Sequence, residues 1–197
     1  SKGFQWLEEI VDYIGTGPII IADAKRGDIG NTAEQYAKSI FDHFGFDAVT
    51  LSPYLGQDSV EPFLDRTEKG VFILCRTSNP SGSQFQDHQD DGKALYEKVA
   101  IWANGINAKD NVGLVVGATA PEELTRIRKI APDLSMLIPG VGAQGGDLEH
   151  SVRVGNQTGV GIINVSRGIC FAGDHSGSAI RNAAESYVAQ MKILFDG

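Results

Sequence analysis

Short apolar runs alternate with amphipathic segments along most of this chain. Apolar residues recur at helical spacing from Phe4 to Ile14, and short apolar runs follow at 18–23, 47–52, 71–75, 112–116, 135–139 and 160–165. Each run has the length and composition of a buried strand. Helical patterns lie between the runs, at 32–44, 59–65, 95–104, 121–130 and 147–154, and a last helix is expected at 178–194. This alternation, with a repeat of about 25 residues, predicts parallel strands joined by right-handed crossovers.

The composition indicates a globular α/β protein, and no linker divides it, so residues 1–197 are expected to form a single domain. A net charge of −8 argues against nucleic acid or an anionic membrane surface as a partner. Two cysteines are too few for a disulfide framework. No run has transmembrane length and the first residues lack the layout of a signal peptide, so a cytoplasmic location is expected.

Charged residues gather at the end of the first apolar run. Asp23 and Lys25 are two positions apart, so on a strand their side chains point the same way. Gly27 and Gly30 then bend the chain and place Asp28 on a separate surface. Acids and a base at the carboxyl end of a strand are how α/β enzymes present catalytic groups, although a solvated surface loop would have the same composition.

A glycine-rich motif, Gly140-Val141-Gly142-Ala143-Gln144-Gly145, follows the fifth predicted strand. It matches a dinucleotide-binding fingerprint, but the next strand ends Ile163-Asn164-Val165-Ser166-Arg167 and offers no acidic residue, which such a site needs. Two architectures fit the pattern, an open doubly wound sheet and a (β/α)8 barrel. The barrel explains the motif better, because the loops after its last two strands often bind phosphate. We therefore expect a TIM (β/α)8-type barrel with six of its eight parallel strands, truncated at the front.

The segment Ala22-Asp23-Ala24-Lys25-Arg26-Gly27-Asp28-Ile29-Gly30-Asn31-Thr32 resembles the central motif of the orotidine 5′-phosphate decarboxylase family, in particular its bacterial branch with longer chains. Further matches follow in the family's order. They are Leu51 to Gly56, Cys75 to Pro80, Gly113 to Thr119, Pro139 to Asp147 and Asn164 to Gly168. The resemblance covers nearly the whole chain and implies conversion of orotidine 5′-phosphate to uridine 5′-phosphate with neither metal nor organic cofactor.

The resemblance implies catalytic roles for three residues. Lys25 matches the lysine that stabilises the carbanion left by CO2 and delivers the proton. Asp23 matches the carboxylate placed near the departing carboxylate, where like charges disfavour the ground state. Asp28 matches the aspartate donated across a dimer interface, with Ile29 and Thr32 lining the partner's site. These roles imply a homodimer with shared active sites.

Binding residues follow from the same motifs. Ser78 matches the residue that reads the pyrimidine's amide edge, Pro139 would pack on the base, and Gln144 would bridge base and phosphate. Arg167 would hold the phosphate, with Gly145 and Ser166 in the two phosphate loops. A turn-forming serine and a solvated arginine are the simpler interpretations of Ser78 and Arg167. The polar stretch 76–92 resembles either a mobile loop over the site or plain surface.

One departure from the family leaves the activity open. The family's first catalytic lysine and a ribose-binding aspartate would both precede Ser1, and Lys2 lies on a helix, where it cannot replace that lysine. Two outcomes therefore stay open: a chain that is active alone, and one that is inactive or poorly folded without the upstream residues. Two alternatives remain: a magnesium-dependent sugar-phosphate decarboxylase or synthase of the same superfamily, and a non-catalytic module that binds a phosphorylated ligand.

Overall fold

Six strands form the main sheet in the computed structural model, which describes residues 1–142 and 144–196. Their order in the sheet is β1-β2-β3-β6-β7-β8, and they are β1 (Ile21–Arg26), β2 (Ala48–Leu51), β3 (Gly70–Arg76), β6 (Val112–Val116), β7 (Ser135–Pro139) and β8 (Gly161–Asn164). Pairing is parallel between β1 and β2, β2 and β3, and β7 and β8. The prediction of six parallel strands is confirmed.

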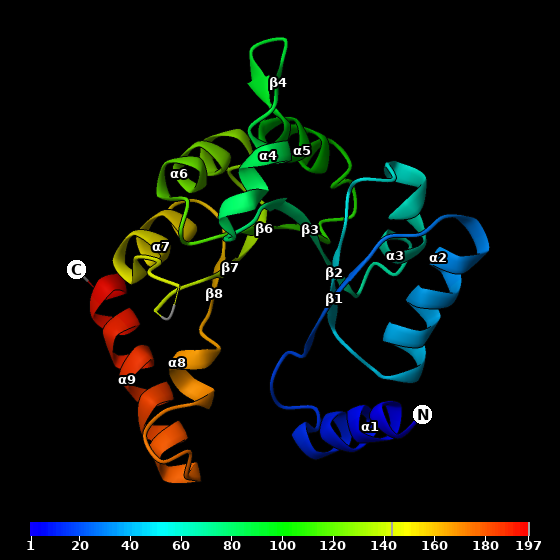
Figure 1. Cartoon of the computed structure of the whole chain (residues 1–197). Coiled ribbons are helices and arrows are strands. Elements are labelled where there is room, and N and C mark those ends of the chain that lie inside the picture. The colour runs from blue at the N-terminus through cyan, green and yellow to red at the C-terminus, as the bar shows by residue number, and fades with distance from the viewer. Residues whose placement is uncertain (143, 197) are drawn as a thin grey trace. The chain divides into compact units, whose positions relative to one another are not determined.

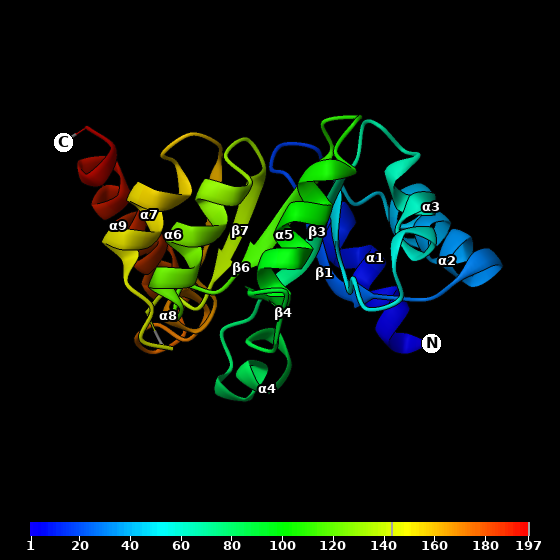
Figure 2. The same ribbon diagram turned by 90° about the horizontal axis from the view of Figure 1, so that it is seen from above.

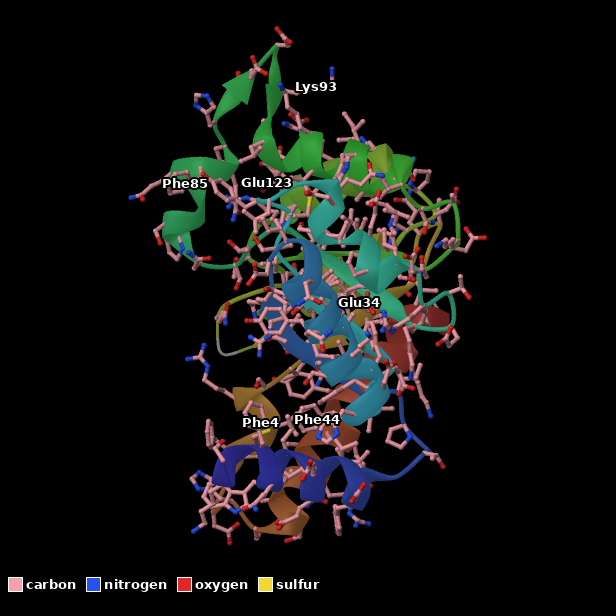
Figure 3. The ribbon with its side chains drawn as sticks, turned by 90° about the vertical axis from the view of Figure 1, so that its right-hand side faces the viewer. Phe4, Glu34, Phe44, Phe85, Lys93 and Glu123 are labelled. Carbon is pink, nitrogen blue, oxygen red and sulfur yellow. The ribbon has the colours of Figure 1, made fainter. Side chains whose placement is uncertain are left out.

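The chain divides into two compact units, and the first comprises residues 1–74 and 105–113. Its helical segments are α1 (Lys2–Ile14), α2 (Gly30–Ala37), the π-helical η1 (Lys38–His43), η2 (Gln57–Ser59) and α3 (Glu61–Leu64). β2 pairs on both sides and all four of its residues are buried, as expected of a strand covered on both faces. Phe4 of α1 stacks on Phe44, with the ring centroids 5.9 Å apart (Figure 3).

The second unit comprises residues 75–104 and 114–197. Its helical segments are η3 (Pro80–Gly82), α4 (Ser83–Gln86), α5 (Leu95–Gly105), α6 (Pro121–Ile130), α7 (Leu148–Gly155), α8 (Arg167–Cys170) and α9 (Gly177–Asp196). α7 contacts both α6 and α9, so these three helices form a row (Figure 1). α6 begins with Pro121 as expected, because proline suits the first turn of a helix.

The stretch 76–92, for which the sequence left a mobile loop over the site and plain surface as alternatives, contains defined short elements. Besides η3 and α4 it includes β4 (Gln89–Asp90), which pairs antiparallel with β5 (Lys93–Ala94). Asp91 and Gly92 join the two strands with φ values of 51° and 70°, the left-handed geometry of a tight hairpin turn. Figure 2 shows α4 and β4 on the same side of α5. The side chain of Phe85 in α4, which is labelled in Figure 3, is 72% exposed.

The single domain expected for residues 1–197 stays a prediction. No helix in residues 1–142 and 144–196 combines the length and apolar character needed to cross a membrane.

Candidate active site

β1 begins and ends three residues later than the apolar run 18–23 predicted, and it is less regular. The strand runs on to Arg26, so Asp23 and Lys25 lie within it and not at its tip. Ala22 pairs with Val49 and Arg26 pairs with Leu51, which leaves Asp23, Ala24 and Lys25 opposite Thr50 alone. This is a β-bulge, and Lys25 within it has a φ of 46°. Left-handed backbone at a residue other than glycine stores strain and often marks a functional site.

The bulge brings the predicted acid and base together. Lys25 Nζ lies 2.6 Å from Asp23 Oδ1, and the two side chains remain 51% and 64% exposed. An ion pair so open to solvent contributes little to folding stability. Because the pair is accessible and stabilises the fold only weakly, the strained backbone that holds it is better explained by chemistry.

Thr50 is a site residue that sequence reasoning missed. Its Oγ1 donates to Asp23 Oδ1 at 3.0 Å and accepts a hydrogen bond from the Lys25 backbone N–H at 3.0 Å. Within an apolar run, a β-branched threonine is indistinguishable from a core residue. Only the register of β1 against β2 reveals what it contacts.

The predicted partner-site residues Asp28, Ile29 and Thr32 follow β1 in the chain, and their hydrogen bonds do not involve the Asp23–Lys25 pair in the described residues. Asp28 Oδ1 accepts from the Ile29 backbone N–H at 2.9 Å, and in the described part of the chain no hydrogen bond or ion pair joins Asp28 to Asp23 or Lys25. Ile29 is 57% exposed and Thr32 is also exposed. Just before and within α2, Ile29 and Thr32 are therefore exposed at the surface and Asp28 is half-buried.

The second unit gathers the predicted base-binding residues. Thr119 Oγ1 donates to the Ser78 carbonyl at 3.0 Å, and a Cβ added at Gly117 would lie 2.8 Å from Ser78 Cα. A Cβ added at Gly140 would lie 3.3 Å from Ser78 Cβ and 3.1 Å from Gln144 Oε1. Only glycines permit such close approach of these loops. Ser78, the end of β7 at Pro139 and Gln144 thus lie around one point.

The glycine-rich loop after β7 folds back on itself. Gly146 N–H donates to the Gly140 carbonyl at 3.1 Å, and Gly145 N–H donates to the Gly142 carbonyl at 2.7 Å. Gln144 and Gly145 are exposed. Ala143 of the motif lies outside the described residues. An exposed glycine-rich turn that also carries the amide side chain of Gln144 suits an anionic ligand.

The loop after β8 lies beside the glycine-rich loop. Ser166 and Arg167 are both exposed, and the Ser166 carbonyl accepts from the N–H groups of Ile169 and Cys170 as α8 begins. Added Cβ atoms at Gly142 and Gly168 would lie 2.8 and 2.7 Å from the hydroxyl oxygen of Tyr187 on α9. Tyr187 therefore packs against both loops, a contact that helical periodicity alone could not reveal.

Gln86 of α4 fixes the segment that contains Ser78. Its Oε1 accepts from Arg76 Nη1 and from the Thr77 backbone N–H, each at 3.0 Å. Its Nε2 donates to Thr77 Oγ1 at 2.8 Å, and that hydroxyl donates to Asn79 Oδ1 at 2.7 Å. Arg76 also lies 3.4 Å from Glu123 of α6, which is labelled in Figure 3. One amide thereby orders both residues flanking Ser78.

Replacing Gln86 with alanine is expected to lower the free energy of unfolding by about 1–3 kcal/mol, because donors of Arg76 and Thr77 lose their acceptor. Chemical denaturation of the purified chain measures this. Gln86→Glu keeps the accepting oxygens and should be affected less. Gln190→Ala, which removes an exposed amide on α9, is the matched control. A Gln86→Ala variant as stable as Gln190→Ala would contradict the assignment.

In the described part of the chain, the Cys75 and Cys170 thiols form no hydrogen bond with the predicted site residues. Burial raises the pKa of the Cys75 thiol, which donates to the Tyr96 carbonyl at 3.1 Å. A protonated, hydrogen-bonded thiol is a poor nucleophile, so Cys75 is a packing residue.

Parallel strands followed by charged side chains, glycine-rich turns and crossover helices define the class: a barrel-type α/β protein. The family model described as "Orotidine 5'-phosphate decarboxylase / HUMPS family" matches residues 3–181. The orotidine 5′-phosphate decarboxylase of Halorubrum lacusprofundi is 54% identical over 184 residues, which are 89% of this chain and 66% of that protein. The chain belongs to the orotidine 5′-phosphate decarboxylase / HUMPS family.

Solved structures agree with this assignment. The chain is similar to Leishmania donovani OMP decarboxylase, with a TM-score of 0.89 and 37% identity over 100% of this chain and 76% of that one. It is also similar to Leishmania donovani UMP synthase, with a TM-score of 0.88 and 43% identity over 97% of this chain and 43% of that one. The barrel-type fold expected from the sequence is confirmed.

Proposed function

We propose that this chain carries the decarboxylation of orotidine 5′-phosphate to uridine 5′-phosphate, with Lys25 as proton donor. The observation that carries the proposal is the Asp23–Lys25 pair, 2.6 Å apart on a strained bulge and open to solvent. Membership of the family and the names of its relatives, a decarboxylase and a UMP synthase, support the substrate and the product. The chain spans 66% of the length of the Halorubrum relative.

The chemistry proposed for the pair is electrostatic. The bond between the pyrimidine ring and its carboxylate breaks, CO2 leaves, and the electron pair remains on the ring carbon. The Lys25 ammonium stabilises this carbanion and transfers a proton from Nζ to the carbon, which completes the product. The Asp23 carboxylate repels the substrate's carboxylate, and this repulsion is relieved as neutral CO2 departs. Asp23 also holds the Lys25 ammonium in place through their 2.6 Å ion pair.

The second unit supplies the proposed binding groups. Ser78 reads the amide edge of the base, Pro139 packs on the ring, and Gln144 reaches base and phosphate. Gly145 lets the glycine-rich loop approach the phosphate closely, and Ser166 and Arg167 hold the phosphate through a hydroxyl and a guanidinium. The proximity of Ser78 and Gln144 around Gly140, and of the two exposed loops around Tyr187, supports these roles.

A homodimer with shared sites is part of the proposal. Asp28, Ile29 and Thr32 would enter the partner's site, which is consistent with an exposed Ile29 and with an Asp28 that bonds only to its own neighbour in the described residues. A cytoplasmic location likewise remains a prediction.

Arg167→Ala is expected to weaken binding of uridine 5′-phosphate by about 2–3 kcal/mol, the value of a charge-assisted contact. Uridine, which lacks the phosphate, should bind wild type and variant alike. Titration calorimetry with both ligands measures the difference. Equal losses of binding free energy for uridine 5′-phosphate and uridine would show that Arg167 does not hold the phosphate. Arg181→Ala, another exposed arginine of the second unit, is the control.

The test of the function is turnover of orotidine 5′-phosphate by the purified chain with a chelator present. Formation of uridine 5′-phosphate that the chelator leaves unchanged is expected. Turnover abolished by chelator and restored by Mg²⁺ would favour the metal-dependent alternative, in which Asp23 is a metal ligand. Binding of uridine 5′-phosphate without turnover would favour the non-catalytic module.

A further inference from the structure

Thr50 occupies an unusual position for a polar side chain. It lies on β2, which pairs with both β1 and β3, and its relative exposure is 0%. Its neighbours Val49 and Leu51 are 0% and 1% exposed. A hydroxyl so enclosed needs hydrogen-bond partners, since valine would fill the same volume without that requirement. The identity of the partners therefore indicates what the hydroxyl contributes.

Both partners of Thr50 are residues of the proposed catalytic pair. The hydroxyl has one proton, and the Lys25 backbone N–H can only donate to it, at 3.0 Å. The Thr50 proton is therefore committed to Asp23 Oδ1, also at 3.0 Å. The Asp23 carboxylate can only accept when ionised, so the direction of each hydrogen bond is determined. One hydroxyl thus joins the side chain of the acid to the backbone of the base.

The hydroxyl also replaces a bond that the bulge removes. Three residues of β1 lie opposite Thr50 alone, so the regular exchange of backbone hydrogen bonds is interrupted there. The Lys25 N–H finds its acceptor in the Thr50 side chain. This bond holds Lys25 at a φ of 46°, which a lysine does not adopt without compensation.

Asp23 Oδ1 receives two donors, Thr50 Oγ1 and Lys25 Nζ at 2.6 Å. Two donors on one oxygen restrict rotation of the carboxylate, and the carboxylate in turn restricts the ammonium. Since both side chains are more than half exposed, little other packing limits them. The buried hydroxyl is the rigid point from which the exposed pair is oriented.

We propose that Thr50 is a positioning residue for the Asp23–Lys25 pair, its buried hydroxyl fixing the Lys25 backbone and the Asp23 carboxylate through one committed proton. Its catalytic significance rests on the function proposed above. The positioning itself does not depend on that function, because the two hydrogen bonds of Thr50 exist whatever substrate the chain takes.

Amide hydrogen exchange at Lys25, followed by NMR on the purified chain, tests the proposal without substrate. Thr50→Val keeps the shape and removes the hydroxyl, so exchange at Lys25 should become about tenfold faster, as expected for one lost hydrogen bond. Thr50→Ser keeps the hydroxyl and should restore slow exchange. Thr125→Val, which removes a hydroxyl bonded to the Pro121 carbonyl on α6, should leave Lys25 unchanged. Unchanged exchange in Thr50→Val, or serine behaving as valine, would overturn the proposal.

A wild-type measurement covers the case in which Thr50→Val does not fold. The Thr50 hydroxyl proton should exchange slowly enough to be observed and should show a cross-relaxation peak to the Lys25 amide proton. A hydroxyl proton in fast exchange with water would overturn the proposal.

Measuring kcat and KM for the wild type and Thr50→Val tests the positioning role of Thr50 and the proposed function separately. In Thr50→Val, kcat should fall while KM stays within about twofold, because Thr50 acts on the reacting pair and not on ligand binding. Serine should restore kcat. A rise in KM with kcat unchanged would contradict a positioning role. Absence of turnover in the wild type would contradict the proposed function and would leave the exchange result decisive for Thr50.

Discussion

Lys25→Ala should abolish measurable turnover of orotidine 5′-phosphate, a loss on the order of 10³-fold or more, while leaving the fold intact. The loss is large because one ammonium both stabilises the carbanion and supplies its proton, and each of those contributions is substantial. The fold should survive because the Lys25 side chain is 51% exposed and its ion pair with Asp23 contributes about 1 kcal/mol or less. Steady-state turnover and denaturation of the same preparation measure both effects.

Lys38→Ala is the matched control for that experiment. Lys38 also carries a half-exposed ammonium, 52% accessible, paired with Glu34 one helical turn away. Its removal should change neither turnover nor stability beyond about 0.5 kcal/mol. If Lys25→Ala retained the turnover of Lys38→Ala, Lys25 would not be the proton donor.

Arg128→Met should lower the free energy of unfolding by about 3–5 kcal/mol, the largest stability loss expected in this chain. The Arg128 side chain belongs to α6 and is only 2% exposed. Burial lowers the pKa of its guanidinium, yet no carboxylate bonds to it in the described residues. Its bonds go instead to backbone carbonyls, those of Ala131, Pro132, Leu134, Val154 and Gly155.

Those carbonyls lie at and just beyond the carboxyl ends of α6 and α7, where helices leave acceptors unsatisfied. Methionine fills much of the volume but donates nothing, so several buried acceptors would lose their partners. Arg153→Met removes an exposed guanidinium paired with Glu149 on α7 and should cost under about 1 kcal/mol. Urea denaturation measures the free energy of unfolding of Arg128→Met and Arg153→Met for this comparison. Similar stabilities would contradict the role assigned to Arg128.

The strands and most helices could be predicted because burial imposes a regular period on a sequence. The bounds of β6, β7 and α6 agree with the sequence, since apolar runs and Pro121 mark them clearly. β1 differed because its second half is charged and bulged, and a simple alternation rule assumes an unbroken strand. The motif nonetheless identified Asp23 and Lys25 correctly as neighbours on one face.

The residues that support the site could not be predicted in the same way. Thr50 and Gln86 act through partners up to 27 and 10 positions away, and nothing local in the sequence identifies those partners. Tyr187 lies on a helix whose periodicity indicates a buried face but not which glycines it meets. The Asp91-Gly92 hairpin is different, because that dipeptide is a recognised turn signal in the sequence itself, within a stretch whose polar composition indicates a mobile loop or plain surface.

Carboxyl-labelled orotidine 5′-phosphate provides the most direct test of the central claim. Labelled CO2 and uridine 5′-phosphate are measured in one sample of the purified chain, with Lys25→Ala run in parallel. We expect one labelled CO2 for each uridine 5′-phosphate formed by the wild type, well above the amount from the variant. Label retained in the nucleotide by the wild type, or released equally by the variant, would contradict it.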